Sequence, residues 1–301
     1  MKVLLCGDLG TAELGVWQRA LLAALPEANW LALAAGRADP AAVEAAVVAN
    51  PLPGSLSGLP NLKLIQSLWA GVDRLLADAT LPTDVPLARM VDPAMTAAMA
   101  ETALWGTLAL HRGFFAYARR QREGRWQVHA QRRADEIRVS VLGRGQLGSE
   151  AARRIEQQGY RTRGWSLRDG APLAPLLAET DIVVNLLPLT SATRGLIDAR
   201  FLAALPPQAS VVNLARGGHV VEADLLAALD SGRLRHAVLD VFDTEPLPAG
   251  HAFWQHPRVT LLPHAAALTD PRSAAVIAAA NLRAARDGLP LRHLVDRVKG
   301  Y

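Results

Sequence analysis

The chain has 301 residues, of which 50% are hydrophobic, with 32 Lys+Arg against 28 Asp+Glu. This length predicts two domains, at about 100 to 200 residues each. The charge of +4 is spread along the chain instead of forming a basic block, which disfavours a nucleic-acid-binding protein. The first apolar run stops at Gly7 and Asp8, too early for a signal peptide or a membrane span, so we expect a cytoplasmic protein. The single cysteine, Cys6, excludes an internal disulfide framework and a cysteine metal cluster, and we expect no metal.

Short apolar runs alternate with helical patterns over the first 95 residues, as in parallel strands joined by crossover helices. Two prolines and a glycine mark a loop at 50–55. The stretch from Thr96 to Arg112 contains strong helix formers and no proline, so we expect a long helix there. A second helix is expected from Phe114 to about Arg125, before an exposed connector at 131–136. The expected strands of this half are 3–6, 30–33, 47–49, 62–65 and 87–90.

A second alternating series begins with an apolar strand at 137–142 and runs to about His264, and a last helix is expected near 272–287. The pattern predicts an α/β protein with two doubly wound parallel-sheet domains of the Rossmann type. We place a substrate domain at 1–95 and 270–301, with a dinucleotide-binding domain at 96–269 inserted into it.

A glycine-rich loop follows the 137–142 strand and reads Gly-Arg-Gly-Gln-Leu-Gly. It lies between that strand and a helix that Gly159 would end, which is the setting of a dinucleotide-binding loop. Gly143 permits the tight turn, Gly145 lets the backbone approach a pyrophosphate, and Gly148 lets the helix pack closely on the strand. The alternative is a purely structural glycine turn. The predicted cofactor contacts of this loop are Gly143, Gly145, Gln146, Leu147 and Gly148.

The next strand ends Gly-Trp-Ser-Leu-Arg-Asp at 164–169, where NAD-binding proteins carry an acidic residue for the ribose hydroxyls. With Ser166 at the tip no carboxylate repels a 2′-phosphate, and Arg168 is close enough in sequence to bind one. This favours NADP(H) over NAD(H). In the competing interpretation Asp169 binds the ribose and Arg168 is a solvated surface residue.

Three later strand ends each carry one reactive side chain: Arg216, Glu245 and His264. Open α/β sheets bind ligands at the carboxyl ends of their strands. The guanidinium of Arg216 suits the carboxylate and carbonyl of a 2-oxo acid. His264 suits a general acid, because an unperturbed histidine has a pKa of about 6.5, and Glu245 would orient the imidazole and favour its protonated form. The other seven histidines are interpreted as surface or packing residues: His111, His129, His219, His236, His251, His256 and His293.

With these motifs in order, the sequence resembles the D-isomer-specific 2-hydroxyacid dehydrogenases over nearly its whole length. The landmarks are Trp-Ala-Gly-Val-Asp at 69–73, the loop at 143–148, Asn-Leu-Leu-Pro-Leu-Thr at 185–190, Asn-Leu-Ala-Arg-Gly at 213–217, Leu-Asp-Val-Phe at 239–242 with Glu-Pro at 245–246, and Pro-His-Ala-Ala at 263–266. By position, the resemblance implies that Arg216, Glu245 and His264 are the catalytic residues. It also implies that Asp240 contacts the nicotinamide amide and that Trp69, Ala70, Gly71 and Arg216 bind the substrate. Further cofactor contacts are expected at Ser166, Arg168, Leu187, Pro188, Leu214, Ala215 and Asp240.

Within the family the sequence looks most like the glyoxylate/hydroxypyruvate reductase A branch. Met95, the strand end Trp165-Ser166 and the final residues 295–301 carry that likeness. The resemblance implies NADPH-dependent reduction of glyoxylate and hydroxypyruvate to glycolate and D-glycerate, by a homodimer paired through the helix at 96–112 and its neighbour. The alternatives are another D-2-hydroxyacid dehydrogenase, of the D-lactate or phosphoglycerate type, and a regulatory protein that senses a dinucleotide.

Overall fold

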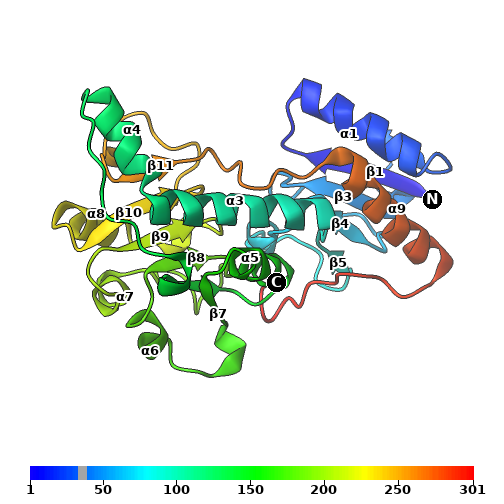
Figure 1. Cartoon of the computed structure of the whole chain (residues 1–301). Coiled ribbons are helices and arrows are strands. Elements are labelled where there is room, and N and C mark those ends of the chain that lie inside the picture. Colours follow the sequence, from blue (N-terminus) through cyan, green and yellow to red (C-terminus); the bar gives the residue numbers. More distant parts are fainter. Residues whose placement is uncertain (33–38) are drawn as a thin grey trace. The chain divides into compact units, whose positions relative to one another are not determined.

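The computed structural model describes residues 1–32 and 39–301 (Figure 1). The chain forms two compact units: unit 1 is Met1–Met95 with Thr269–Tyr301, and unit 2 is Thr96–Leu268. Each unit contains one parallel β-sheet with helices around it. The predicted fold class, two parallel-sheet α/β domains, is therefore confirmed. Thr269, which we expected at the end of the second domain, belongs to unit 1.

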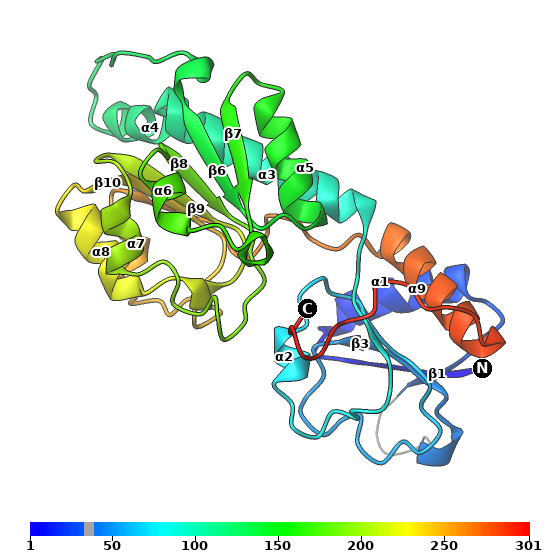
Figure 2. The same cartoon turned by 90° about the horizontal axis from the view of Figure 1, so that it is seen from below.

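Unit 1 is a five-stranded parallel sheet in the order β2-β1-β3-β4-β5. The helices α1 and α9 pack side by side (Figures 1 and 2). Residue Leu294 forms one antiparallel bridge to Ala88 at the β5 edge. The elements of unit 1 are β1 Lys2–Gly7, α1 Thr11–Ala24, β2 Asn29–Ala32, the 3₁₀ turn η1 Pro40–Ala42, β3 Ala45–Ala49, β4 Ile65–Ser67, α2 Asp73–Leu76, β5 Leu87–Ala88 and α9 Pro271–Asp287.

The fourth strand differs from its prediction. We expected 62–65, but β4 is Ile65–Ser67 and overlaps that range only at Ile65. Gln66 and Ser67 are polar yet buried, because Gln66 Oε1 accepts a hydrogen bond of 2.7 Å from Asn281 on α9 and Ser67 Oγ donates to the Trp69 carbonyl. Hydrogen bonds satisfy these groups within the core. Leu33, which we placed in the second strand, lies outside the described residues.

The helix α3, Pro93–Arg112, begins in unit 1 and enters unit 2 at Thr96. The sheet of unit 2 has six parallel strands in the order β11-β10-β9-β8-β6-β7. Its remaining elements are α4 Phe114–Arg122, η2 Ala134–Glu136, β6 Arg138–Leu142, α5 Gln146–Glu156, β7 Arg161–Trp165, η3 Leu167–Asp169, α6 Leu173–Leu177, β8 Ile182–Asn185, α7 Ala199–Ala204, β9 Ala209–Asn213, η4 Gly217–His219, α8 Glu222–Asp230, β10 Leu234–Leu239, η5 Ala252–Trp254 and β11 Val259–Leu261.

Helices cover both faces of the unit 2 sheet (Figure 2). The apolar side chains of α3 and α5, such as Ala103 and Ile155, form one core with Val139, Val184 and Val212 of the strands. Residues of α6, α7 and α8 form the core on the opposite face. The chain runs from β6 out to β7 and then returns to β8 on the other side of β6. At such a switch point, open α/β sheets bind ligands beyond the carboxyl ends of the strands.

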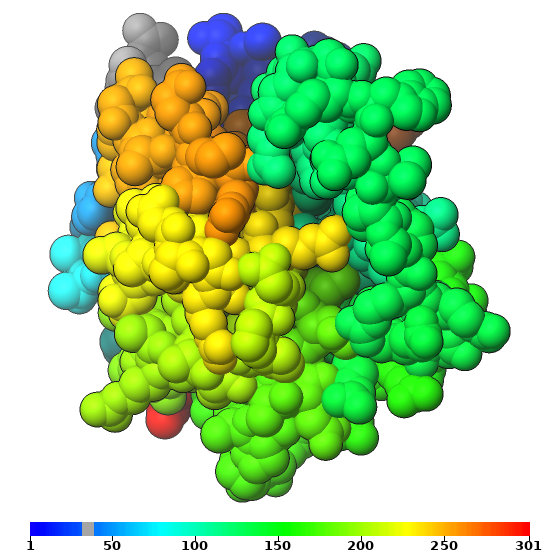
Figure 3. All heavy atoms as spheres, turned by 60° about the vertical axis from the view of Figure 1, so that its left-hand side comes forward, coloured from blue at the N-terminus to red at the C-terminus, as the bar shows by residue number. Residues whose placement is uncertain are grey.

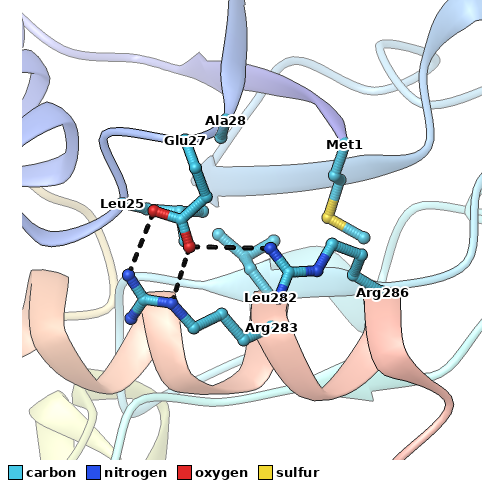
Figure 4. Close-up of a pocket in the computed structure, with 7 residues that line it drawn as sticks. All are labelled: Met1, Leu25, Glu27, Ala28, Leu282, Arg283 and Arg286. Carbon is cyan, nitrogen blue, oxygen red and sulfur yellow. Dashed lines mark hydrogen bonds and ion pairs between the residues drawn. The ribbon is translucent and has the colours of Figure 1, made fainter.

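Among the described residues, no helix combines the length and apolar character needed to span a bilayer. The cavity beside α9 in unit 1 has a volume of about 10 Å³, room for roughly one water. Arg283 and Arg286 both pair there with Glu27, at 2.8 and 3.6 Å (Figure 4), so this cluster links α9 to the turn after α1.

Candidate active site

The glycine loop after β6 forms a tight cradle. Gly143 has a φ of +106°, and its N–H donates to the Trp165 carbonyl at 2.8 Å. A Cβ atom on Gly143 would lie 2.5 Å from the Leu186 oxygen, and one on Gly148 would lie 1.8 Å from the Gly143 oxygen, so neither position accepts a side chain. A Cβ on Gly145 would meet nothing within 4 Å. The backbone is therefore tightly packed at Gly143 and Gly148 and has free space at Gly145. This arrangement lets a pyrophosphate approach the backbone of the loop.

The helix α5 starts from this cradle with Gly145 at its N-cap and no side-chain cap. The first N–H groups of a helix have no partner within it and carry a partial positive charge. Gly145 and Gln146 are exposed, whereas Gly148 is buried. These residues could hold the phosphates of a dinucleotide, and the loop geometry fits that group.

Two buried asparagines organise the neighbouring strand ends. Asn185 ends β8 and Asn213 ends β9, and their side chains form a hydrogen bond of 3.0 Å. The Asn185 amide oxygen also accepts from the Leu187 N–H, and that of Asn213 from the Ala215 N–H. The pair thus fixes two of the loops predicted to contact the cofactor. The sequence analysis missed this role, although an asparagine at the end of an otherwise apolar strand is a signal that could have indicated it.

At the tip of β7, Ser166 is extended and begins the 3₁₀ turn η3. Its N–H donates to Asp169 Oδ2 at 3.2 Å, and the same oxygen pairs with Arg144 of the glycine loop at 3.1 Å. The ion pair with Arg144 is the main reason that the pKa of Asp169 lies below its usual value. One oxygen of the Asp169 carboxylate, Oδ2, thus accepts hydrogen bonds from both Arg144 and Ser166. The alternative in which Asp169 binds the ribose stays a prediction. Arg168 is exposed beside it.

Glu245 and His264 lie in contact beyond β10 and β11. His264 Nδ1 and Glu245 Oε2 are 2.7 Å apart, and Glu245 Oε1 accepts from the Phe242 N–H at 2.8 Å. Burial raises the pKa of Glu245. Its hydrogen bonds from His264 and Phe242, with the charges of His264 and Arg216, outweigh burial and hold that pKa below its ordinary value. Since Nδ1 is engaged by the carboxylate, Nε2 is the ring nitrogen available to a ligand.

Asp240 holds the segment that carries His264. Its side chain is buried, and its two carboxylate oxygens accept hydrogen bonds from the N–H groups of Ala265 and Ala266 at 2.7 to 3.1 Å. Its carbonyl oxygen accepts from the His264 N–H at 2.8 Å. His264 itself has a φ of +54°, uncommon for a non-glycine residue. Asp240 therefore keeps the imidazole-bearing backbone in this conformation, an anchoring role that the sequence did not indicate.

Arg216 follows β9 at the same sheet edge. Its carbonyl accepts hydrogen bonds from the Asn213 side chain and from His219 Nδ1, both at 3.0 Å. A Cβ on the next residue, Gly217, would lie 1.8 Å from the Phe242 carbonyl carbon, so the loop packs directly on the backbone before Glu245. His219 is buried, in agreement with its interpretation as a packing residue. Arg216, Glu245 and His264 therefore all lie in unit 2, at the carboxyl ends of its strands.

Comparison with known proteins gives concordant matches. The family profile described as D-isomer specific 2-hydroxyacid dehydrogenase, NAD binding domain, matches residues 104–266. A glyoxylate/hydroxypyruvate reductase A from Klebsiella pneumoniae (strain 342) is 39% identical over 307 residues, covering 97% of each protein. The chain belongs to the D-isomer-specific 2-hydroxyacid dehydrogenase family. This confirms the resemblance found in the sequence.

Solved structures of this family match over almost the whole chain. A D-isomer specific 2-hydroxyacid dehydrogenase from Xanthobacter autotrophicus Py2, in complex with NADPH and MES, has a TM-score of 0.92 and 40% identity, covering 100% of this chain and 99% of that one. The NADPH-dependent glyoxylate/hydroxypyruvate reductase from Sinorhizobium meliloti, in complex with NADP and sulfate, has a TM-score of 0.91 and 34% identity with the same coverage.

The predicted substrate residues Trp69, Ala70 and Gly71 lie in unit 1, directly after β4. Trp69 packs edge-on against Trp17, with ring centroids 5.9 Å apart, and its carbonyl accepts from the Met90 N–H at 3.0 Å. The N–H groups of Ala70 and Gly71 donate to no described residue.

Throughout the described part of the chain, no three His, Cys, Asp or Glu side chains form a group that could hold a metal ion.

Proposed function

We propose that this dehydrogenase reduces glyoxylate and hydroxypyruvate to glycolate and D-glycerate with NADPH. The observation that carries the proposal is the 2.7 Å contact between His264 and Glu245 at the sheet edge that also bears the glycine cradle. Relatives named for this activity match 95 to 97% of the chain, which supports the choice of substrates.

In this proposal His264 is the general acid. Glu245 holds Nδ1, so Nε2 donates a proton to the carbonyl oxygen of the 2-oxo acid, and Arg216 binds its carboxylate with a planar guanidinium. The cofactor, when bound, supplies the hydride. The residues of unit 1 predicted to bind the substrate, Trp69, Ala70 and Gly71, remain in that role. The N–H groups of Ala70 and Gly71, which donate to no described residue, suit an anionic ligand, because backbone N–H groups bind anions.

The proposed cofactor contacts are the cradle, the loops fixed by the asparagine pair, and the tip of β7. Ser166 and Arg168 would receive a 2′-phosphate, and we propose a preference for NADP(H) over NAD(H). Complexes of two relatives with NADPH or NADP support this assignment. The assignment of Asp240 to the nicotinamide amide stays a prediction, since its carboxylate also anchors Ala265 and Ala266. We propose accordingly that unit 2 is the dinucleotide-binding domain and unit 1 the substrate domain.

The proposal is tested with purified protein by following NADPH and NADH absorbance with glyoxylate, hydroxypyruvate, pyruvate and phenylpyruvate. We expect the highest kcat/KM with NADPH and either glyoxylate or hydroxypyruvate. A higher value with pyruvate would assign the enzyme to the D-lactate type. Tight NADPH binding without turnover of any 2-oxo acid would indicate a dinucleotide sensor instead.

Glu245→Gln should move the alkaline limit of reductase activity to lower pH. The hydrogen bond from His264 favours the charged carboxylate and helps to hold the pKa of Glu245 below its ordinary value. In general a carboxylate beside an imidazole favours the protonated ring, and the neutral amide of glutamine does not. Activity that needs a protonated general acid should therefore end at lower pH in the variant than in the wild type. The measurement is kcat/KM as a function of pH. A profile that coincides with the wild-type profile would remove Glu245 from the mechanism.

We propose that the protein forms a homodimer through α3, α4 and the segment that follows them. Large apolar side chains are exposed there, namely Trp105, Phe114, Trp126 and Val128. Helix α4 and the segment directly after it lie at the surface of the molecule (Figure 3). Large apolar side chains that are exposed within one segment of the chain favour a protein interface there. We expect light scattering to give twice the chain mass and Trp126→Asp to reduce it. Leu52→Asp, at an exposed site in unit 1, is the control. A wild-type monomer would contradict this proposal.

A further inference from the structure

Arg144 occupies the second position of the glycine loop, between the two glycines that shape the cradle. Its stem lies against Gly164 of β7, where a Cβ atom would be 3.3 Å from Arg144 Cγ and 3.5 Å from Cδ. A glycine inside a strand has little local benefit and often marks the close approach of another group. Here it leaves room for the arginine to cross β7 and reach the turn beyond it.

At that turn Arg144 meets the one carboxylate that follows the predicted phosphate-binding tip. Arg144 Nη1 lies 3.1 Å from Asp169 Oδ2, and the same oxygen accepts from the Ser166 N–H. Asp169 is therefore hydrogen-bonded to Ser166, one of the two residues assigned to the 2′-phosphate. Both ion-pair partners are substantially exposed, at 58% and 33% of their side chains, and such pairs contribute little to stability. The pair matters because it lies beside Ser166, where the 2′-phosphate is proposed to bind.

An unmasked carboxylate at the end of this strand discriminates against NADP(H), because it repels a 2′-phosphate and accepts hydrogen bonds from the ribose hydroxyls of NAD(H). Asp169 lies three residues beyond Ser166, within one short turn. We infer that Arg144 determines cofactor specificity by masking the charge of Asp169, so that the tip of β7 receives a 2′-phosphate despite the acidic residue beside it. This inference rests on the proposed use of NADPH and adds to it a residue that the strand end alone does not indicate.

Masking and direct contact make different predictions for paired substitutions. If Arg144 acts through Asp169, then Arg144→Ala exposes a carboxylate, and the further change Asp169→Asn removes it again. The double variant should therefore recover the affinity for NADPH that the single variant loses. If Arg144 instead binds the phosphate itself, the double variant should stay as weak as Arg144→Ala, since neither change restores the cation.

The experiment measures equilibrium dissociation constants for NADPH and NADH by calorimetry, without substrate. We expect Arg144→Ala to weaken NADPH about tenfold or more while changing NADH less than about threefold, the scale of one charge-assisted contact. Arg144→Ala/Asp169→Asn should return NADPH to within about threefold of the wild-type value. Arg163→Ala is the matched control. Arg163 lies on β7 and pairs with Glu179 at 3.1 Å instead of with Asp169. It should leave both constants unchanged.

An unchanged ratio of the two constants in Arg144→Ala would overturn the inference, and so would a double variant as weak as the single one. These outcomes are distinct from failure of the proposed function. Wild-type protein that binds NADH more tightly than NADPH would refute the proposed cofactor preference, while the shift caused by Arg144→Ala would still decide the masking role. Absence of turnover would refute the enzymatic proposal without affecting either binding result.

Discussion

Replacement of His264 by alanine is expected to lower kcat by about 10²-fold or more, the scale of a general acid. The variant keeps Arg216 and the cradle, so the dissociation constant for NADPH should stay close to that of the wild type. The side chain of His264 contacts Glu245 beyond the strand ends and is half exposed, so its removal leaves no cavity in the core. Steady-state kinetics with NADPH and hydroxypyruvate measure the effect.

A second histidine controls for the loss of an imidazole in general. His256 pairs with Asp230 at 3.1 Å outside the proposed site, and His256→Ala should retain activity within about twofold, as expected of a residue outside the site. Near-wild-type turnover by a folded His264→Ala protein would show that another group donates the proton.

Arg216→Lys is expected to lower kcat/KM by about 10²-fold although the positive charge is kept, because lysine lacks the planar fork that binds a carboxylate through two parallel hydrogen bonds. The loop around Arg216 is fixed by its carbonyl, which accepts from Asn213 and His219, so the backbone should persist in the variant. The same exchange at the exposed Arg163 should leave kcat/KM unchanged. If Arg216→Lys retained wild-type kcat/KM, charge alone would account for substrate binding and the bidentate contact would be excluded.

The sequence predicted the elements whose signals are local. The strand at 137–142, the glycine loop and the helix that follows were all identified, and β6, Arg138–Leu142, and α5, Gln146–Glu156, match them closely. The apolar periodicity predicts the strand and the helix, and the glycine pattern predicts the loop between them. The last helix was equally accessible, since α9, Pro271–Asp287, begins at a proline and is followed by Gly288 in a left-handed conformation.

Features that depend on distant partners could not be predicted in this way. In β4, Ile65–Ser67, the buried Gln66 accepts a hydrogen bond from Asn281, which lies 215 residues away in the sequence. The anchoring of the His264 segment by Asp240 likewise requires the side chain of one strand end to reach the backbone of another. The pair formed by Arg144 and Asp169 crosses a strand and a turn. In each case a polar group is satisfied by tertiary structure, which local pattern does not encode.

The central claim is tested most directly by the stoichiometry and stereochemistry of the reaction with hydroxypyruvate. NADPH oxidation is followed by absorbance, and the glycerate formed is quantified by chiral chromatography, for wild-type protein and for His264→Ala. We predict one D-glycerate for each NADPH oxidised by the wild type, and a rate at least about 10²-fold lower for the variant. NADPH binding without glycerate formation, or formation of L-glycerate, would contradict the account.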